Sequence, residues 1–156
     1  MKKNSLIPVL HVITSLNVGG AERAITSLLT QQEGGKYYNI VLCLRGQGRF
    51  VRELEESGIE VYCWGLSFRS MAIVAIFKSI RRVCQIEPKI IHGWMYHGNL
   101  VGFLIRLCFV RKSALIWNVR HSLIDIELEK ISTRCVIWFN KLLSRTPDQI
   151  IYNSKV

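Results

Sequence analysis

Apolar strands alternate with amphipathic helical periods along the whole chain. Residues 8–14 are mostly apolar and β-branched and lead into a turn that contains Gly19 and Gly20, a pattern typical of a buried strand. After this turn, apolar side chains recur at i, i+3, i+4, i+7 and i+8 from Ala21, which is the period of one helical face. The alternation continues with strands predicted over residues 39–44, 59–64, 89–92, 114–119 and 149–152, and helices over residues 50–56, 71–85, 99–109 and 128–143.

Strands that alternate with helices pair in parallel through right-handed crossovers. The order of elements therefore predicts an α/β fold, namely a Rossmann-like doubly wound parallel sheet in three α/β/α layers. The 156 residues, 49% of them hydrophobic, suffice to build one core, and no linker or internal repeat divides them. We expect residues 1–156 to form a single domain.

The most apolar stretch does not predict a membrane span. Residues 100–110 are apolar but carry Arg106, and a membrane-spanning helix needs roughly 20 apolar residues. The N-terminal apolar stretch is broken by Pro8 and His11 and has no small-residue cleavage site, so it does not resemble a signal peptide. We expect a cytoplasmic protein.

The chain has five cysteines without a CxxC pair or metal-ligand spacing: Cys43, Cys63, Cys84, Cys108 and Cys135. Free cysteine is among the most buried residue types. We therefore expect all five to be small core side chains in a reducing compartment.

Polar residues follow several predicted strands, at the edge where an open parallel sheet binds its ligands. The candidates are Asn17, Gly19 and Gly20 after the first strand, Arg45 after the second, Trp94, His97 and Asn99 after the fourth, and Arg120 and His121 after the fifth. The glycine pair would let the backbone approach a phosphate at a helix N-terminus. Alternatively, the pair forms a tight turn that only connects strand and helix.

Two common nucleotide-binding classes are disfavoured. The GxGxxG fingerprint is absent, and the second strand ends in Arg45 where a nicotinamide-binding domain places an acidic residue for the ribose. No GxxxxGK[ST] sequence occurs, so nothing supports a phosphate-loop ATPase.

Four segments resemble glycosyltransferase family 4, and they occur in the family's order. They are VLHVI followed by GGAER at residues 9–13 and 19–23, IIHGWMYHGN at residues 90–99, WNVRHS at residues 117–122 and IYNS at residues 151–154. The GGAER segment is the most diagnostic of them. The chain departs from the family at Trp94, where a second histidine is frequent.

The resemblance implies the N-terminal, acceptor-side half of a GT-B enzyme that transfers a hexose from a nucleotide sugar. The sugar-nucleotide-binding C-terminal domain, with its basic pair and Glu-x7-Glu motif, cannot be placed in this chain, so we expect the chain alone to be inactive. By the resemblance, Gly19 and Gly20 lie against the donor diphosphate and His121 reaches the transferred sugar. It also implies retention of configuration, no metal and no cofactor besides the donor. Cleft-lining or acceptor roles are predicted for Asn17, Arg45, Trp94, His97, Asn99 and Arg120.

The histidines also have simpler interpretations. His121 could cap or hydrogen-bond within a loop, and His97 with Asn99 could begin a helix of which Asn99 is the N-cap. His11, inside the first strand, is more typical of a hydrogen-bonded core histidine, and His92 fits either interpretation.

The formal net charge of +10 indicates an anionic partner or surface. Basic residues cluster at Lys78, Arg81 and Arg82, at Arg106, Arg111 and Lys112, and at Arg134, Lys141 and Arg145, with Phe77, Phe103, Phe109 and Trp138 nearby in sequence. Such helices suit an anionic membrane. Solvated basic faces and buried aromatic residues are the alternative.

The favoured hypothesis is a transferase that acts on a polyprenyl-linked or other saccharide acceptor of the cell envelope, as in lipopolysaccharide or other polysaccharide biosynthesis. It would work at the inner face of the bacterial plasma membrane as a peripheral protein. A second hypothesis is a truncated, non-catalytic module that binds acceptor or membrane. Nucleic-acid binding has only the charge in its favour, without a recognised motif, so we expect none.

Overall fold

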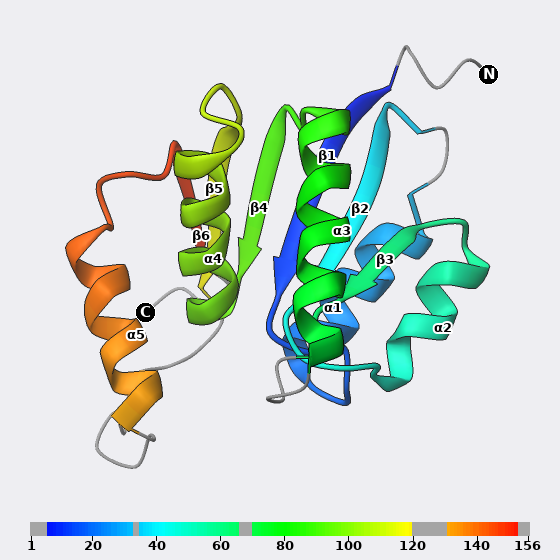
Figure 1. Cartoon of the computed structure of the whole chain (residues 1–156), viewed down its shortest axis with the longest axis horizontal. Helices are drawn as coiled ribbons and strands as arrows, with labels where there is room; N and C mark the ends of the chain where they lie inside the picture. The colour runs from blue at the N-terminus through cyan, green and yellow to red at the C-terminus, as the bar shows by residue number, and fades with distance from the viewer. Residues whose placement is uncertain (1–5, 33–34, 66–69, 120–130, 153–156) are drawn as a thin grey trace.

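Six parallel strands form one sheet in the order β3-β2-β1-β4-β5-β6, which confirms the predicted doubly wound, Rossmann-like fold (Figure 1). The computed structural model describes residues 6–32, 35–65, 70–119 and 131–152. The strands are β1 (Ile7–Ile13), β2 (Tyr37–Cys43), β3 (Glu60–Cys63), β4 (Ile90–Trp94), β5 (Ala114–Val119) and β6 (Gln149–Tyr152). All five strand pairs are parallel, as helical crossovers require.

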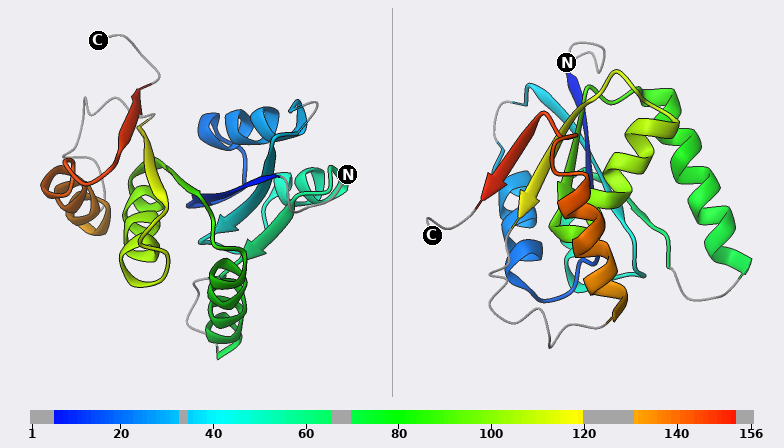
Figure 2. Two further views of the ribbon diagram at one scale, coloured as in Figure 1. Left: turned by 90° about the horizontal axis from the view of Figure 1, so that it is seen from above. Right: turned by 90° about the vertical axis from the view of Figure 1, so that its left-hand side faces the viewer.

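Helices cover both faces of this sheet, which gives the three predicted layers (Figure 2). They are α1 (Gly20–Thr30), α2 (Arg49–Glu56), α3 (Ser70–Ile86), α4 (Met95–Cys108) and α5 (Ile131–Leu142). One face carries α1 and α2, and the other carries α3 and α4, with α5 against α4. Among the described helices, none combines the length and apolar character needed to cross a bilayer.

Alternate residues of the strands build two cores. Leu10 and Val12 of β1 point toward α3 and α4, where they join Ile91 and Leu115. Ile13 points the other way, toward α1 and α2. Because both faces of β1 are buried, the strand is a nearly continuous apolar run rather than an alternating one. Each such fully buried aliphatic side chain contributes about 1.5–3 kcal/mol of transfer free energy.

Three glycines let α4 approach the sheet closely. A Cβ at Gly98 would lie 2.3 Å from the carbonyl oxygen of Val12, and one at Gly93 would lie 2.6 Å from the Cα of Asn99. A Cβ at Gly102 would lie 3.2 Å from a methyl group of Ile91. The start of α4 is therefore held tightly over the carboxyl ends of β1 and β4.

The junction between β4 and α4 differs from the prediction. The strand extends to Trp94 and the helix begins at Met95, so Trp94 is the N-cap residue and Asn99 lies inside the helix. The interpretation of Asn99 as an N-cap is therefore wrong. Met95 adopts φ = 63°, a left-handed conformation that is uncommon for a residue with a side chain, and it turns the strand directly into the helix without a loop.

The prediction that all five cysteines belong to the core is also wrong. Cys43 is buried and Cys63 is half-buried, but Cys84, Cys108 and Cys135 are exposed. These three lie on the outer sides of α3, α4 and α5. The apolar character of cysteine alone therefore does not predict whether it is buried. All five cysteines are free thiols.

Candidate functional site

The sheet has a topological switch point between β1 and β4. These strands are neighbours, with Ile13 opposite Trp94 at their carboxyl ends, but α1 and α4 leave them toward opposite faces (Figure 1). Ligands of open α/β sheets bind in the crevice that such a divergence creates. The candidate site lies at this edge.

The turn after β1 leads into the N-terminus of α1. Gly19 is the N-cap residue, and among the described residues no side chain caps the helix through it. Its backbone is extended (φ −169°, ψ 171°), and Gly20 has no atom within 4 Å of the position that a Cβ would take. Neither glycine has a positive φ, so the turn itself does not require glycine at either position. The open space and exposed amides suit an anion, and the diphosphate-binding role of Gly19 and Gly20 stays a prediction.

A carboxylate lies over this helix N-terminus. Ser15 Oγ donates a hydrogen bond of 2.9 Å to Glu22 Oε1, and Glu22 Oε2 lies only 2.2 Å from where a Cβ of Gly19 would be. A phosphate that approaches Gly19 would therefore displace the Glu22 side chain. Glu22 belongs to the GGAER segment, but the sequence predicted no role for it. Whether its carboxylate turns back over Gly19 depends on its side-chain rotamer, which the sequence does not show.

The loop after β2 packs directly on this turn. The amide of Arg45 donates to the carbonyl of Thr14 (2.9 Å), and a Cβ at Gly48 would overlap the backbone of Leu16, 2.4 Å away. This contact brings the exposed Arg45 to the same edge as the exposed Asn17. The structure thus gathers predicted residues from two separate strands beside the N-terminus of α1.

A buried aromatic cluster of His11, His92 and Trp94 lies on the α1 side of β1 and β4. Trp94 Nε1 donates to His11 Nδ1 over 3.3 Å, and the ring centroids of His92 and Trp94 are 4.7 Å apart. Burial lowers the pKa of His11 to about 4, so its imidazole is neutral at pH 7. Since Nδ1 accepts from Trp94, Nε2 carries the proton and donates to Asn39 Oδ1 at 3.3 Å. The interpretation of His11 as a hydrogen-bonded core histidine is confirmed.

The remaining predicted site residues differ in accessibility. Trp94 is 2% exposed and Asn99 is fully buried, whereas His97 is half-buried. Both side-chain polar atoms of Asn99 lack a hydrogen-bond partner among the described residues. A ligand at this edge would meet Asn17, Arg45 and His97 before Trp94 or Asn99. His121 and Arg120 lie outside the described residues.

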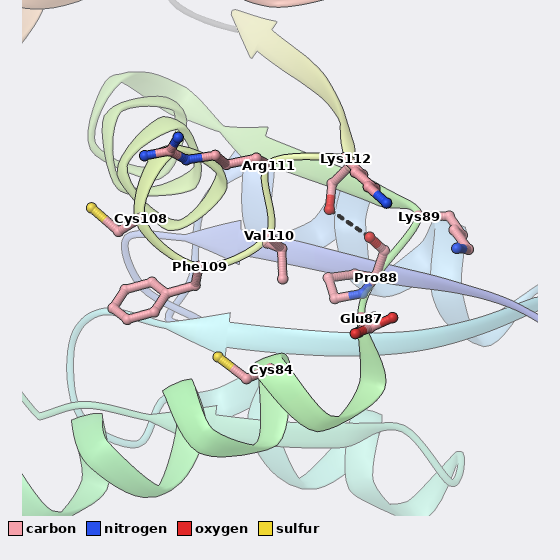
Figure 3. A pocket seen from close by; sticks show the side chains of 10 residues that line it. Cys84, Glu87, Pro88, Lys89, Cys108, Phe109, Val110, Arg111 and Lys112 are labelled. Carbon is pink, nitrogen blue, oxygen red and sulfur yellow. Dashed lines mark hydrogen bonds between the residues drawn. The ribbon is translucent and has the colours of Figure 1, made fainter.

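A second hollow lies at the opposite end of the sheet. It has a volume of about 410 Å³ and is lined by residues that precede β4 and β5, including Lys89, Arg111 and Lys112, with Cys84 and Cys108 on its helical walls (Figure 3). The amino ends of parallel strands meet there, so this basic hollow is separate from the crevice. The sequence placed Arg111 and Lys112 in a basic cluster but did not pair them with Lys89.

One solved structure has a similar fold along nearly the whole chain. It is the crystal structure of Anabaena HepE in complex with UDP and glucose, with a TM-score of 0.67 and 19% sequence identity. The match covers 95% of this chain and 38% of HepE, so the chain spans less than half the length of that protein. No protein-family model and no curated protein sequence matches the chain. At this identity the likeness shows a shared fold, the Rossmann-like α/β domain described above.

Proposed function

We propose that this chain is the N-terminal, acceptor-side domain of a GT-B glycosyltransferase of family 4. The observation that carries the proposal is the glycine turn after β1, which places the N-terminus of α1 at the switch point of a parallel sheet. The similarity in fold to HepE, solved with UDP and glucose, supports a nucleotide sugar as donor. The GGAER segment supports the family.

In the proposed reaction a hexose leaves a nucleoside diphosphate, and the developing charge on the diphosphate needs fixed donors. The amides at Gly19 and Gly20 and the guanidinium of Arg45 would supply part of that stabilisation, since preorganised donors act where charge develops. His121 would contact the transferred sugar. A second domain would supply the remaining cations, so the chain alone would not catalyse transfer.

We propose a lipid-linked or other cell-envelope saccharide as the acceptor. The net charge of +10 favours work beside an anionic surface such as the inner face of a bacterial plasma membrane. A peripheral position would bring a polyprenyl-linked acceptor within reach of the crevice.

The first test is the native gene beyond codon 156. A reading frame that continues into a second α/β domain with a basic pair and a Glu-x7-Glu motif would support the transferase. A stop codon at that position would contradict it and would favour a non-catalytic module that binds acceptor or membrane.

The second test is a substitution in the complete enzyme. We expect His121→Ala to lower kcat about 10²–10³-fold with little change in KM, since the side chain would act on the reacting sugar. His97→Ala is the control and should lower kcat less, because His97 is predicted to line the cleft and not to contact the transferred sugar. Near-normal turnover of the His121 variant would refute the assignment of that residue.

A further inference from the structure

Helix α5 contacts α4 through a side that carries Asn140 together with the half-buried Val136 and Ile137. Of its 12 residues, all described, only Asn140 is buried. Asn140 Nδ2 donates to the carbonyl of Tyr96 on α4 (3.0 Å) and to that of Val136 (2.8 Å). A helix that packs on a core normally turns its apolar side inward. Here the inward side carries the hydrogen-bonded amide of Asn140, beside Val136 and Ile137, which are only half-buried.

The most exposed apolar residues of α5 point away from the protein. Ile131, Cys135, Trp138 and Leu142 recur at i, i+4, i+7 and i+11, which places them in one stripe. The exposed fractions of Ile131, Trp138 and Leu142 are 77%, 59% and 64%. Trp138 and Leu142 each lie two residues from Asn140, about 200° around the helix and therefore on the opposite side. The alternative that Trp138 belongs to the core is wrong.

Cations border this stripe on one side. Arg134, Lys141 and Arg145 are all exposed and make no ion pair with any described residue, and α5 contains no acidic residue. Exposed apolar surface with a basic border is uncommon on a protein without a partner.

Helix α3 also carries cations, but it is built differently. Its inner side is apolar and packs into the core through Val83, and Arg82 is held by Glu60 in an ion pair of 2.8 Å. Arg82 is thus part of the fold rather than a free basic residue. Helix α3 also exposes apolar side chains, Ile73, Val74 and Phe77, but unlike α5 it buries an apolar residue in the core.

We propose that α5 lies in the headgroup region of an anionic bilayer, with Trp138, Ile131 and Leu142 inserted and Arg134, Lys141 and Arg145 at the lipid phosphates. The charge is complementary to anionic lipid, and a basic helix with one apolar side binds such a surface in the plane of the interface. The indole of Trp138 is an amphipathic ring of the kind enriched at that depth. This inference specifies the membrane contact of the proposed function and rests on it, but it does not depend on sugar transfer.

Flotation with vesicles of phosphatidylglycerol and phosphatidylcholine tests the proposal, with vesicles of phosphatidylcholine alone as reference. We expect the chain to float with the anionic vesicles, and Trp138 emission to shift to shorter wavelength. The Trp138→Ser and Leu142→Ser double variant should partition about tenfold more weakly, because the inserted side chains are removed. The Arg134→Glu and Lys141→Glu double variant should lose the preference for anionic lipid.

The matched control is Arg49→Glu with Arg52→Glu on α2, which reverses the same number of charges on the other face of the sheet and should float as the wild type does. Circular dichroism checks that each variant is folded. The proposal is overturned if the wild type does not float or if the α5 variants float unchanged. It is also overturned if the wild type is a dimer that these variants convert to a monomer without any vesicle binding.

Loss of transfer to a soluble acceptor would count against the transferase and not against this membrane contact. In the complete enzyme, the α5 variants should retain that transfer while they lose flotation. Failure of the transferase proposal and failure of the membrane proposal therefore give different results.

Discussion

Burial fixes the protonation state of His11 in β1. Its Nδ1 accepts from Trp94 and its Nε2 donates to Asn39, an arrangement that only the neutral ring can make. The lowered pKa of about 4 means that the folded state resists protonation, so this residue destabilises the fold as the pH falls from its ordinary pKa of 6.5 toward 4. At neutral pH His11 orients Trp94 and is not available as a proton donor to a ligand.

Glu60 makes the stability of the fold depend on pH in a second, more acidic range. It accepts hydrogen bonds from Arg82 at 2.8 and 3.0 Å and from Tyr38, and Arg82 is the main reason that its pKa falls from 4.5 to about 2. The folded state therefore favours the carboxylate. The resulting stabilisation is fully present above pH 4.5 and is lost as the pH falls toward 2.

We predict that Arg82→Gln lowers the free energy of unfolding by about 1–2 kcal/mol at pH 7, after allowance for solvent screening of the partly exposed pair. The difference between variant and wild type should shrink as the pH falls from 4.5 toward 2, the range over which Glu60 of the wild type becomes protonated. Urea unfolding at several pH values measures this difference in the free energy of unfolding. A difference that stays constant with pH would show that Arg82 acts by packing instead.

At the scale of elements, α4 is positioned by close backbone contact more than by side-chain packing. Gly98 faces the Val12 carbonyl, and Gly93 faces the backbone of Asn99. Because the opposing atoms belong to the backbone, they cannot rotate away from a new methyl group. The start of α4, which carries His97, therefore depends on glycine at these positions.

We predict that Gly98→Ala destabilises the protein by about 1–3 kcal/mol, the usual range for overpacking. Gly46→Ala is the control, since no atom lies within 4 Å of its Cβ position, and its unfolding midpoint should stay near that of the wild type. The midpoint of urea unfolding measures both. Equal midpoints for the two variants would mean that α4 can move outward without cost.

The strands could be predicted from the sequence because their apolar runs are bounded by turn residues, as at residues 8–14. The end of β4 could not, because a left-handed Met95 leaves no mark in residue type. Likewise, a helical period shows that Ile131, Trp138 and Leu142 share one side of α5. It does not show that this side faces outward, which depends on where Asn140 finds its partners.

For the whole molecule, two regions compete as anion sites, and they lie at opposite ends of the sheet. The crevice offers amides at the N-terminus of α1 and Arg45, but it has a carboxylate, Glu22, above Gly19. The other hollow has three cations, Lys89, Arg111 and Lys112, against one carboxylate, Glu87. Charge alone would therefore favour the hollow, whereas the topology of the sheet favours the crevice.

We predict that UDP added to the chain shifts the backbone amide resonances of residues 15–20 and Arg45, with a Kd of about 1 mM or weaker because one domain supplies only part of the contacts. Gly20→Ala should weaken these shifts, since a methyl group would enter the space left for the phosphate, while Lys112→Glu should leave them unchanged. Two-dimensional NMR titrations of the wild type and of the two variants measure these shifts. Shifts centred on Lys89, Arg111 and Lys112 that disappear in Lys112→Glu would instead make the basic hollow the anion site, because long-range charge would then outweigh the fixed amides of the helix N-terminus.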